Sequence, residues 1–259
     1  DPTPSSISDV QTGVIGAGQT VTIEGAIVTG LMIGAAIGAG LGGRLSDRYG
    51  RRPVVLGAIS LDLFAVLLGG ATALLPVYAR DILHVGSTGL GHLAAAPGIG
   101  AAVTALWFSF RPMKSEVGLK MLGAVILFGI ATIIFGSTAF LSRDIAMPVG
   151  LGSLVVLGGA DMVSVFVRQS LVQLHTPDAM RGRVSSLSQL TISASNELGE
   201  AESGFLAALV GPVAAVIGGG VGAIIITLLW SRLFPELRLA RSFDPPDIGR
   251  AEISQEKAS

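Results

Sequence analysis

Two long runs of apolar residues joined by a short block of charge limit what this chain can fold into more than any other feature. The runs extend over about residues 22–43 and 54–78 and contain almost no charge. The block between them includes the densest charge in the chain, Gly43-Arg44-Leu45-Ser46-Asp47-Arg48-Tyr49-Gly50-Arg51-Arg52. Because about 20 apolar residues in an α-helix cross the hydrocarbon core of a bilayer, the pattern predicts a membrane hairpin.

The composition extends this interpretation to the whole chain. Of the 259 residues 50% are hydrophobic and 14% are charged, against about 25% charged residues in soluble domains. Such a chain cannot cover a surface that faces water, so the composition predicts an all-α, polytopic membrane helical bundle. The 36 glycines indicate helices that approach one another closely.

Several classes of function are disfavoured by what the sequence lacks. The chain contains no cysteine and only three histidines, and these form no recognisable metal cluster. It shows no Walker loop, catalytic triad or zinc spacing, so we expect neither an enzyme nor a cofactor. We expect no nucleic-acid partner either; the expected partners are membrane lipid, a small-molecule substrate and protons.

Hydropathy and turn residues divide the chain into about seven membrane spans. The predicted spans are residues 22–43, 54–78, 88–110, 119–141, 147–167, 184–210 and 213–233. The predicted organisation is a loose segment (1–21), a hairpin helix with the charged block (22–53), six helices (54–234) and a solvated, partly disordered tail (235–259). Gly211-Pro212 is expected to end the sixth span and separate it from the seventh. Residues 80–84 are expected to form a short loop.

The positions of basic residues predict an orientation. With seven spans, one side of the membrane receives nearly all basic residues: Arg44, Arg48, Arg51, Arg52, Arg111, Lys114, Lys120, Arg168, Arg181, Arg183 and Arg232. The other side receives Arg80 and Arg143, each followed by an aspartate. The positive-inside rule therefore places the N-terminus outside and the C-terminus in the cytoplasm of a multi-pass inner-membrane protein.

The charged block resembles a known motif. The pattern Gly-x-Leu-Ser-Asp-Arg-x-Gly-Arg-Arg at 43–52 resembles the signature loop of the major facilitator superfamily, between the second and third membrane helices. Its matching functional positions are Gly43, Asp47, Arg48, Gly50, Arg51 and Arg52. The resemblance implies that Asp47 clamps a later helix, which would begin near Val184 here; alternatively, the arginines only set topology by binding headgroups.

A second resemblance covers residues 52–240. Segments 52–79, 159–173, 176–184, 194–200 and 233–238 resemble the C-terminal half of the enterobactin-exporter-like branch of the superfamily. Residues 13–52 resemble instead the first hairpin of sugar porters. Family members have two six-helix halves, so the chain is similar to a signature hairpin joined near Arg52 to a C-terminal half, a partial major facilitator fold without helices three to six.

Acidic residues in the sixth predicted span carry the sharpest functional hypothesis. Asn196, Glu197 and Glu200 lie three or four residues apart and therefore share a helix face, whereas Glu202 points elsewhere. A carboxylate in hydrocarbon is costly, so it faces protein or water and is often functional. Glu197 and Glu200 are therefore candidates for proton coupling; the alternative is a bent, partly wet helix in which they bind backbone or serine groups.

Further polar and aromatic residues inside the spans have expected roles. Asp161 and Arg168 lie two helical turns apart, so we expect a structural or water-facing pair rather than a substrate contact. Asp62 either lines a cavity or caps a neighbouring helix. Trp107 and Trp230 lie near the cytoplasmic ends of their spans, as anchors at the membrane interface do.

Three functions remain open at this stage. The first is a secondary transporter for proton-coupled efflux of small amphipathic molecules such as siderophores or drugs, acting alone or as a homodimer that restores two halves. The second is a truncated or recombined membrane fragment that does not transport. The third is a sugar uptake porter, which rests only on residues 13–52.

Overall fold

The computed structural model of the chain describes residues 60–61, 71–111, 113, 116–174 and 181–235. The chain divides into two compact units, Asp1–Gly50 and Arg51–Ser259, and every described residue belongs to the second. The first predicted span, the signature-loop residues (Gly43, Asp47, Arg48, Gly50, Arg51, Arg52) and Asp62 lie outside the described residues. So does the predicted tail beyond residue 235.

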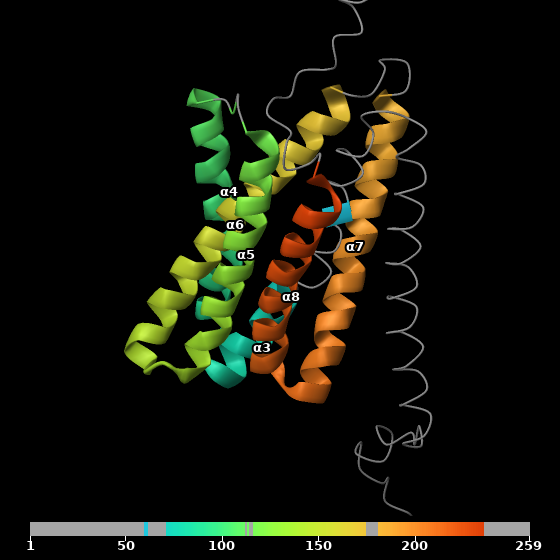
Figure 1. The fold of residues 1–259 in the computed structure, drawn as a ribbon. Coiled ribbons are helices and arrows are strands. Elements are labelled where there is room, and N and C mark those ends of the chain that lie inside the picture. The colour runs from blue at the N-terminus through green and yellow to red at the C-terminus, as the bar shows by residue number, and fades with distance from the viewer. Residues whose placement is uncertain (1–59, 62–70, 112, 114–115, 175–180, 236–259) are drawn as a thin grey trace, which may run out of the picture. The chain divides into compact units, whose positions relative to one another are not determined.

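Every element in the described part of the chain is helical (Figure 1). The elements are η2 (Ala71–Leu74), α3 (Leu75–Val77), η3 (Tyr78–Ile82), α4 (Gly86–Phe110), α5 (Val117–Ser137), η4 (Thr138–Phe140), α6 (Arg143–Leu174), α7 (Arg181–Val210) and α8 (Pro212–Leu233). Four segments are long and apolar enough to cross a membrane: α4, α5 with η4, α6 and α8. The predicted all-α membrane bundle is therefore confirmed.

Helix α7 has the length of a membrane span but not the composition of one. It contains 30 residues, yet it is not among the four segments that are apolar enough to cross a membrane. This agrees with the sequence, in which the predicted span over residues 184–210 carries two side-chain amides and three carboxylates. A helix of this kind needs protein or water on its polar face, because hydrocarbon cannot solvate these groups.

The boundaries of the helices follow local backbone chemistry. Gly211 has φ +87°, a conformation that favours glycine, and Pro212 begins α8, because a proline at the first helical position loses no hydrogen bond. This confirms the predicted break. The predicted end of the fifth span was wrong: α6 continues through Arg168 to Leu174. Arg168 is only 3% exposed, so it lies within the bundle and not in a basic loop.

Helix α6 organises the bundle. Helices α4 and α5 both pack against α6 rather than against each other, and α8 packs against α5 and α7. Glycines permit the closest approaches: a Cβ on Gly129 of α5 would lie 2.7 Å from the carbonyl oxygen of Gly220 in α8, and the reverse holds at Gly220. The sequence prediction that glycines mark close helix packing holds for this pair.

Two apolar clusters stabilise the two ends of the bundle. One joins η2, α3 and η3 to the start of α4, the end of α5 and the starts of α6 and α8, and Tyr78 and Phe135 lie at its centre. Their ring centroids are 4.6 Å apart, and the Tyr78 hydroxyl donates a hydrogen bond to the carbonyl of Gly136 at 3.2 Å. The other cluster joins the start of α5 to the ends of α6 and α8.

Trp230 belongs to this second cluster. Its side chain is 4% exposed, and its indole nitrogen donates a hydrogen bond to Ser60 Oγ at 2.9 Å. The prediction that Trp230 anchors the chain at the membrane interface is therefore wrong. Trp107 is 60% exposed at the end of α4, as an interfacial tryptophan would be.

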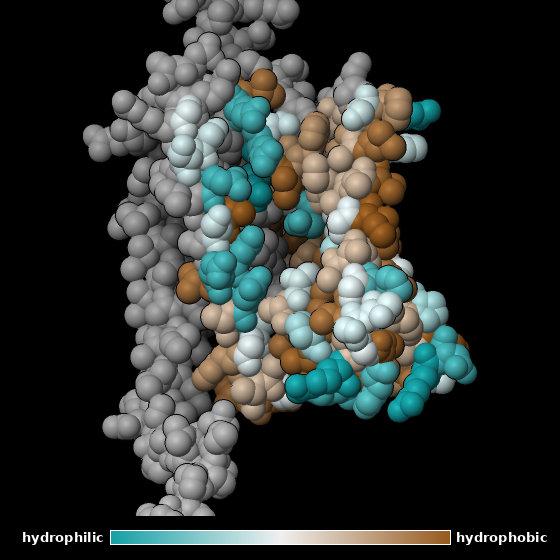
Figure 2. Space-filling model, turned by 180° about the vertical axis from the view of Figure 1, so that it is seen from behind, coloured by the Kyte–Doolittle hydropathy of each residue, from teal (hydrophilic) through white to brown (hydrophobic). Residues whose placement is uncertain are grey.

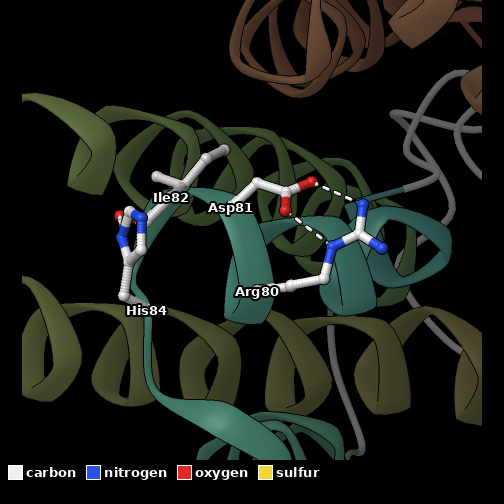
Figure 3. A network of polar contacts seen from close by, with 4 residues as sticks. All are labelled: Arg80, Asp81, Ile82 and His84. Atoms are coloured by element: carbon white, nitrogen blue, oxygen red, sulfur yellow. Dashed lines mark hydrogen bonds and ion pairs between the residues drawn. The ribbon is translucent and has the colours of Figure 1, made fainter.

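A polar turn joins η3 to α4 at the end of the bundle that contains the Tyr78–Phe135 cluster (Figure 3). Arg80 donates two hydrogen bonds to the carboxylate of Asp81, at 2.6 and 2.9 Å. These bonds hold the pKa of Asp81 below its usual value. His84 has φ +53°, and its Nδ1 lies 3.1 Å from the carbonyl oxygen of Ile82. The predicted loop over residues 80–84 is thus partly a π-helical turn, followed by one residue in the left-handed conformation.

Candidate functional site

A cavity of about 340 Å³ lies near the middle of α4, α6 and α7, beside the first apolar cluster, to which its lining residue Leu157 belongs. Residues from α4, α5, α6, α7 and η2 line it, although they are far apart in the sequence. The lining residues are Thr72, Pro97, Gly98, Ala101, Phe128, Leu157, Gly158, Asp161, Asn196, Gly199 and Glu200. The bundle therefore brings together three of the polar residues that the sequence singles out, Asp161, Asn196 and Glu200.

Close packing of α4 on α6 sets one side of this cavity. A Cβ on Gly158 would overlap the backbone of Pro97, so the two helices touch through their main chains at this point. The proline also matters, because it leaves the carbonyl of a residue one turn earlier without its usual helical donor. Small residues on both helices thus give access to backbone that larger side chains would cover.

The charges in the cavity are of one sign. Asp161 is half-buried, whereas Asn196 and Glu200 are exposed on α7. Among the described residues that line the cavity, two are acidic and none is basic. The arrangement offers carboxylate and amide oxygens to one space, which can accept hydrogen bonds or bind a cationic group.

Polar side chains continue along α7 beyond this cavity. The exposed residues include Ser185, Ser186, Gln189, Ser193, Asn196, Glu197 and Glu200, which recur every three or four positions. They therefore form one face of the helix, called here the α7 polar face. Figure 2 shows a column of hydrophilic side chains along the α7 side, with the surface hollowed between this column and the more hydrophobic helices.

The other predicted residues occupy different positions. Glu197 is exposed and does not line the cavity. Arg168 is buried near the second apolar cluster, seven residues after Asp161 in α6, which corresponds to roughly 10 Å along the helix axis. Direct pairing of Asp161 with Arg168 stays a prediction.

Some lining residues were not expected from the sequence. Phe128 lies in an apolar stretch of α5, where nothing in the pattern distinguishes a residue that faces a cavity from one that faces lipid. Pro97 and Gly98, inside α4, also line the cavity, although the sequence interpretation assigns them no role in a site. The proline was nevertheless a usable signal, because a proline inside a membrane helix is tolerated where its backbone meets other protein or water.

Comparison with known proteins finds partial relatives. The chain is 30% identical over 199 residues to the enterobactin exporter EntS of Citrobacter koseri, which covers 76% of this chain and 45% of the relative. It is 31% identical over 200 residues to the enterobactin exporter of Shigella flexneri, covering 74% of this chain and 47% of that protein. The Escherichia coli O139:H28 exporter is 29% identical over 196 residues, with coverages of 74% and 45%.

No family model and no solved structure matches the chain. The chain spans about half the length of the curated relatives that it matches. Over about three quarters of its own length, the chain is thus similar to part of the enterobactin exporters, and its resemblance to that branch of the major facilitator superfamily is confirmed.

Proposed function

We propose that the chain is part of a secondary active transporter in the inner membrane, which exports small amphipathic molecules of siderophore or drug type in exchange for protons. The observation that carries the proposal is the cavity at the middle of the bundle, where Asp161, Asn196 and Glu200 meet. Intramembrane carboxylates that face a cavity are typical of substrate and proton pathways. The relatives are named as enterobactin exporters, which supports a siderophore as the first substrate to test.

Of the two carboxylates predicted for proton coupling, we assign the coupling to Glu200. Glu200 lines the cavity together with Asp161, whereas Glu197, three residues earlier on the same helix, does not line it. Ionisable residues that face a cavity inside a membrane bundle are the ones that mark substrate and proton pathways, which favours Glu200. Asn196 would then contact the substrate, and Glu197 would face water or protein beside the cavity. Because Asp161 also lines the cavity, we propose that it contacts the substrate as well, in place of the purely structural role expected from the sequence.

The test is substrate-induced proton release from the purified chain in liposomes, with enterobactin and then ethidium as probes. We expect Glu200→Gln to abolish proton release, because the amide cannot take up a proton. Glu197→Gln is the matched control, with the same substitution one turn away, and should retain release. Equal behaviour of the two variants would contradict the assignment to Glu200. Absence of release from the unsubstituted chain would contradict the transport proposal itself.

A non-transporting membrane fragment is the second candidate, since the chain spans about half of its relatives. Major facilitator transport needs a path between two halves, so an active chain would have to supply the second half, for example as a homodimer. The mass of the particle in detergent separates the two candidates: a strict monomer favours the fragment. Sugar uptake rests on residues 13–52, outside the described residues, and is not proposed.

A further inference from the structure

A second, larger hollow lies on the outside of the bundle, between α4 and α5. Because both helices pack on α6 and not on each other, they leave a groove of about 780 Å³, whose floor is α6. Val103 on the α4 wall, Leu127 on the α5 wall and Val156 on the floor are 62%, 45% and 44% exposed. Large apolar side chains in a membrane bundle are exposed in this way where they contact lipid. This groove is called here the α4–α5 groove.

The charged residues that line the groove lie at one end. Arg111, directly after α4, and Lys120, in the first turn of α5, line its mouth. The guanidinium carbon of Arg111 lies 5.7 Å from the centroid of the Trp107 ring, so a cation–π contact holds the arginine over the groove wall. Glu116 lies in the same turn but is not among the residues that line the groove.

The groove has the length of one bilayer leaflet. From Arg111 it extends along α4 to Gly100, which corresponds to roughly 16 Å at the helical rise. Half of the hydrocarbon core measures about 15 Å. At the deep end a Cβ on Gly100 would overlap the carbonyl oxygen of Val155 in α6. Main-chain contact between α4 and α6 therefore closes the groove near mid-membrane and leaves its basic end open.

We propose that the α4–α5 groove binds one anionic phospholipid, with the headgroup phosphate at Arg111 and Lys120 and an acyl chain along α6. The charge at the mouth complements a negatively charged headgroup, and basic pockets between membrane helices bind anionic lipids in this way. The apolar walls and the closed deep end suit a hydrocarbon chain that extends to the middle of the bilayer. The proposal is independent of transport and requires only that the bundle lies in a membrane.

Quenching of tryptophan fluorescence by brominated lipid tests the proposal on the full chain in detergent. Trp107 lines the groove, whereas Trp230 is buried in the second apolar cluster, so quenching on contact reports mainly on Trp107; Trp107→Phe should remove the signal. We expect brominated phosphatidylglycerol to quench at roughly tenfold lower concentration than brominated phosphatidylcholine, from the attraction of two basic residues. The double variant Arg111→Gln/Lys120→Gln should remove this preference, and Arg232→Gln, at the same end of the bundle, should keep it.

A second variant tests the groove itself without touching its charges. Gly123 lines the groove, and a Cβ there would meet nothing within 4 Å, so the side chain of Gly123→Leu begins in open space and extends into the groove. We expect it to weaken quenching by both lipids, whereas Gly218→Leu, an equally open position on α8, should not. Four outcomes would each overturn the proposal. Two concern the charges: equal quenching by the two lipids, and a preference for phosphatidylglycerol that survives in the double variant. Two concern the groove: unchanged quenching in Gly123→Leu, and a dimer that covers the groove and excludes both lipids.

Discussion

Gly100 illustrates how a single residue determines the geometry of this bundle. Its Cα faces the backbone of α6, and an added Cβ would overlap the carbonyl oxygen of Val155 and lie 2.8 Å from the amide nitrogen of Gly159. Both neighbours are main-chain atoms, so neither can rotate away as a side chain would. The α4–α6 contact, and with it the deep end of the α4–α5 groove, therefore depends on glycine at this position.

We predict that Gly100→Ala destabilises the bundle. The extra methyl group must push α4 and α6 apart, which costs about 1–3 kcal/mol when backbone cannot yield. Gly91→Ala is the matched control on the same helix, because a Cβ there meets nothing within 4 Å. Unfolding by SDS in mixed micelles, followed by circular dichroism, measures the difference. If both variants unfold at the same SDS fraction, the helices do not touch at Gly100.

Single residues also show where sequence patterns stop being informative. Trp107 and Trp230 have the same predicted place near the ends of their spans, yet one is 60% exposed and the other 4%. The difference arises because Trp230 packs on α5 and α6 and reaches Ser60, whereas Trp107 lies on a wall of the groove. The exposure of each tryptophan is decided by contacts between helices that are distant in the sequence. The hydropathy along one helix carries no information about these contacts.

At the scale of the helices, the sequence was informative wherever a strong local signal existed. Gly211 and Pro212 place the boundary between α7 and α8, and the apolar run before Arg111 ends α4. The end of α6 was not predictable in this way, because Arg168 looks like the basic end of a span. The local sequence around a buried arginine can be the same as that around an arginine at the membrane interface. Only the surrounding helices distinguish the two.

In the candidate site too, some features follow from the local sequence and others only from helix packing. The i, i+4 spacing of Asn196 and Glu200 places both on one face of α7, and both line the cavity. Glu197 does not line the cavity, and Asp161 lines it from another helix. Both facts depend on how α7 is rotated against α6. Helical periodicity narrows the choice to neighbouring residues, and packing makes the final selection.

For helix α7, we predict that its polar face contacts water in the membrane-embedded protein. The chain has no cysteine, so single cysteines can be introduced without removing native ones. Gln189→Cys and Ser193→Cys on the α7 polar face should react with a water-soluble maleimide in proteoliposomes. Ile225→Cys and Leu228→Cys, on exposed apolar positions of α8, should react at least roughly tenfold more slowly, because thiolate formation is suppressed in hydrocarbon. Equal rates on the two helices would show that α7 faces lipid.

At the scale of the whole molecule, the described charges favour one orientation in the membrane. Arg111, Lys120 and Arg232 lie where α4 ends, α5 begins and α8 ends, so they share one end of the bundle. At the opposite end Arg80 is paired with Asp81, and Arg143 is followed by Asp144 at the start of α6. Lysine and arginine near the ends of membrane helices are retained on the cytoplasmic side.

We therefore predict that the turn before α6 is extracellular or periplasmic and that the end of α8 is cytoplasmic. In intact bacterial cells a membrane-impermeant maleimide should label Ser142→Cys but not Arg232→Cys, and both should react once the cells are opened. Ser142 and Arg232 are both exposed, so a difference in labelling reports on the side of the membrane and not on burial. Because removing one arginine weakens the orienting signal slightly, Leu233→Cys, which is also exposed, serves as a second cytoplasmic site that leaves every basic residue in place. The reverse labelling pattern would mean that regions outside the described residues, and not the charges of this bundle, determine its orientation.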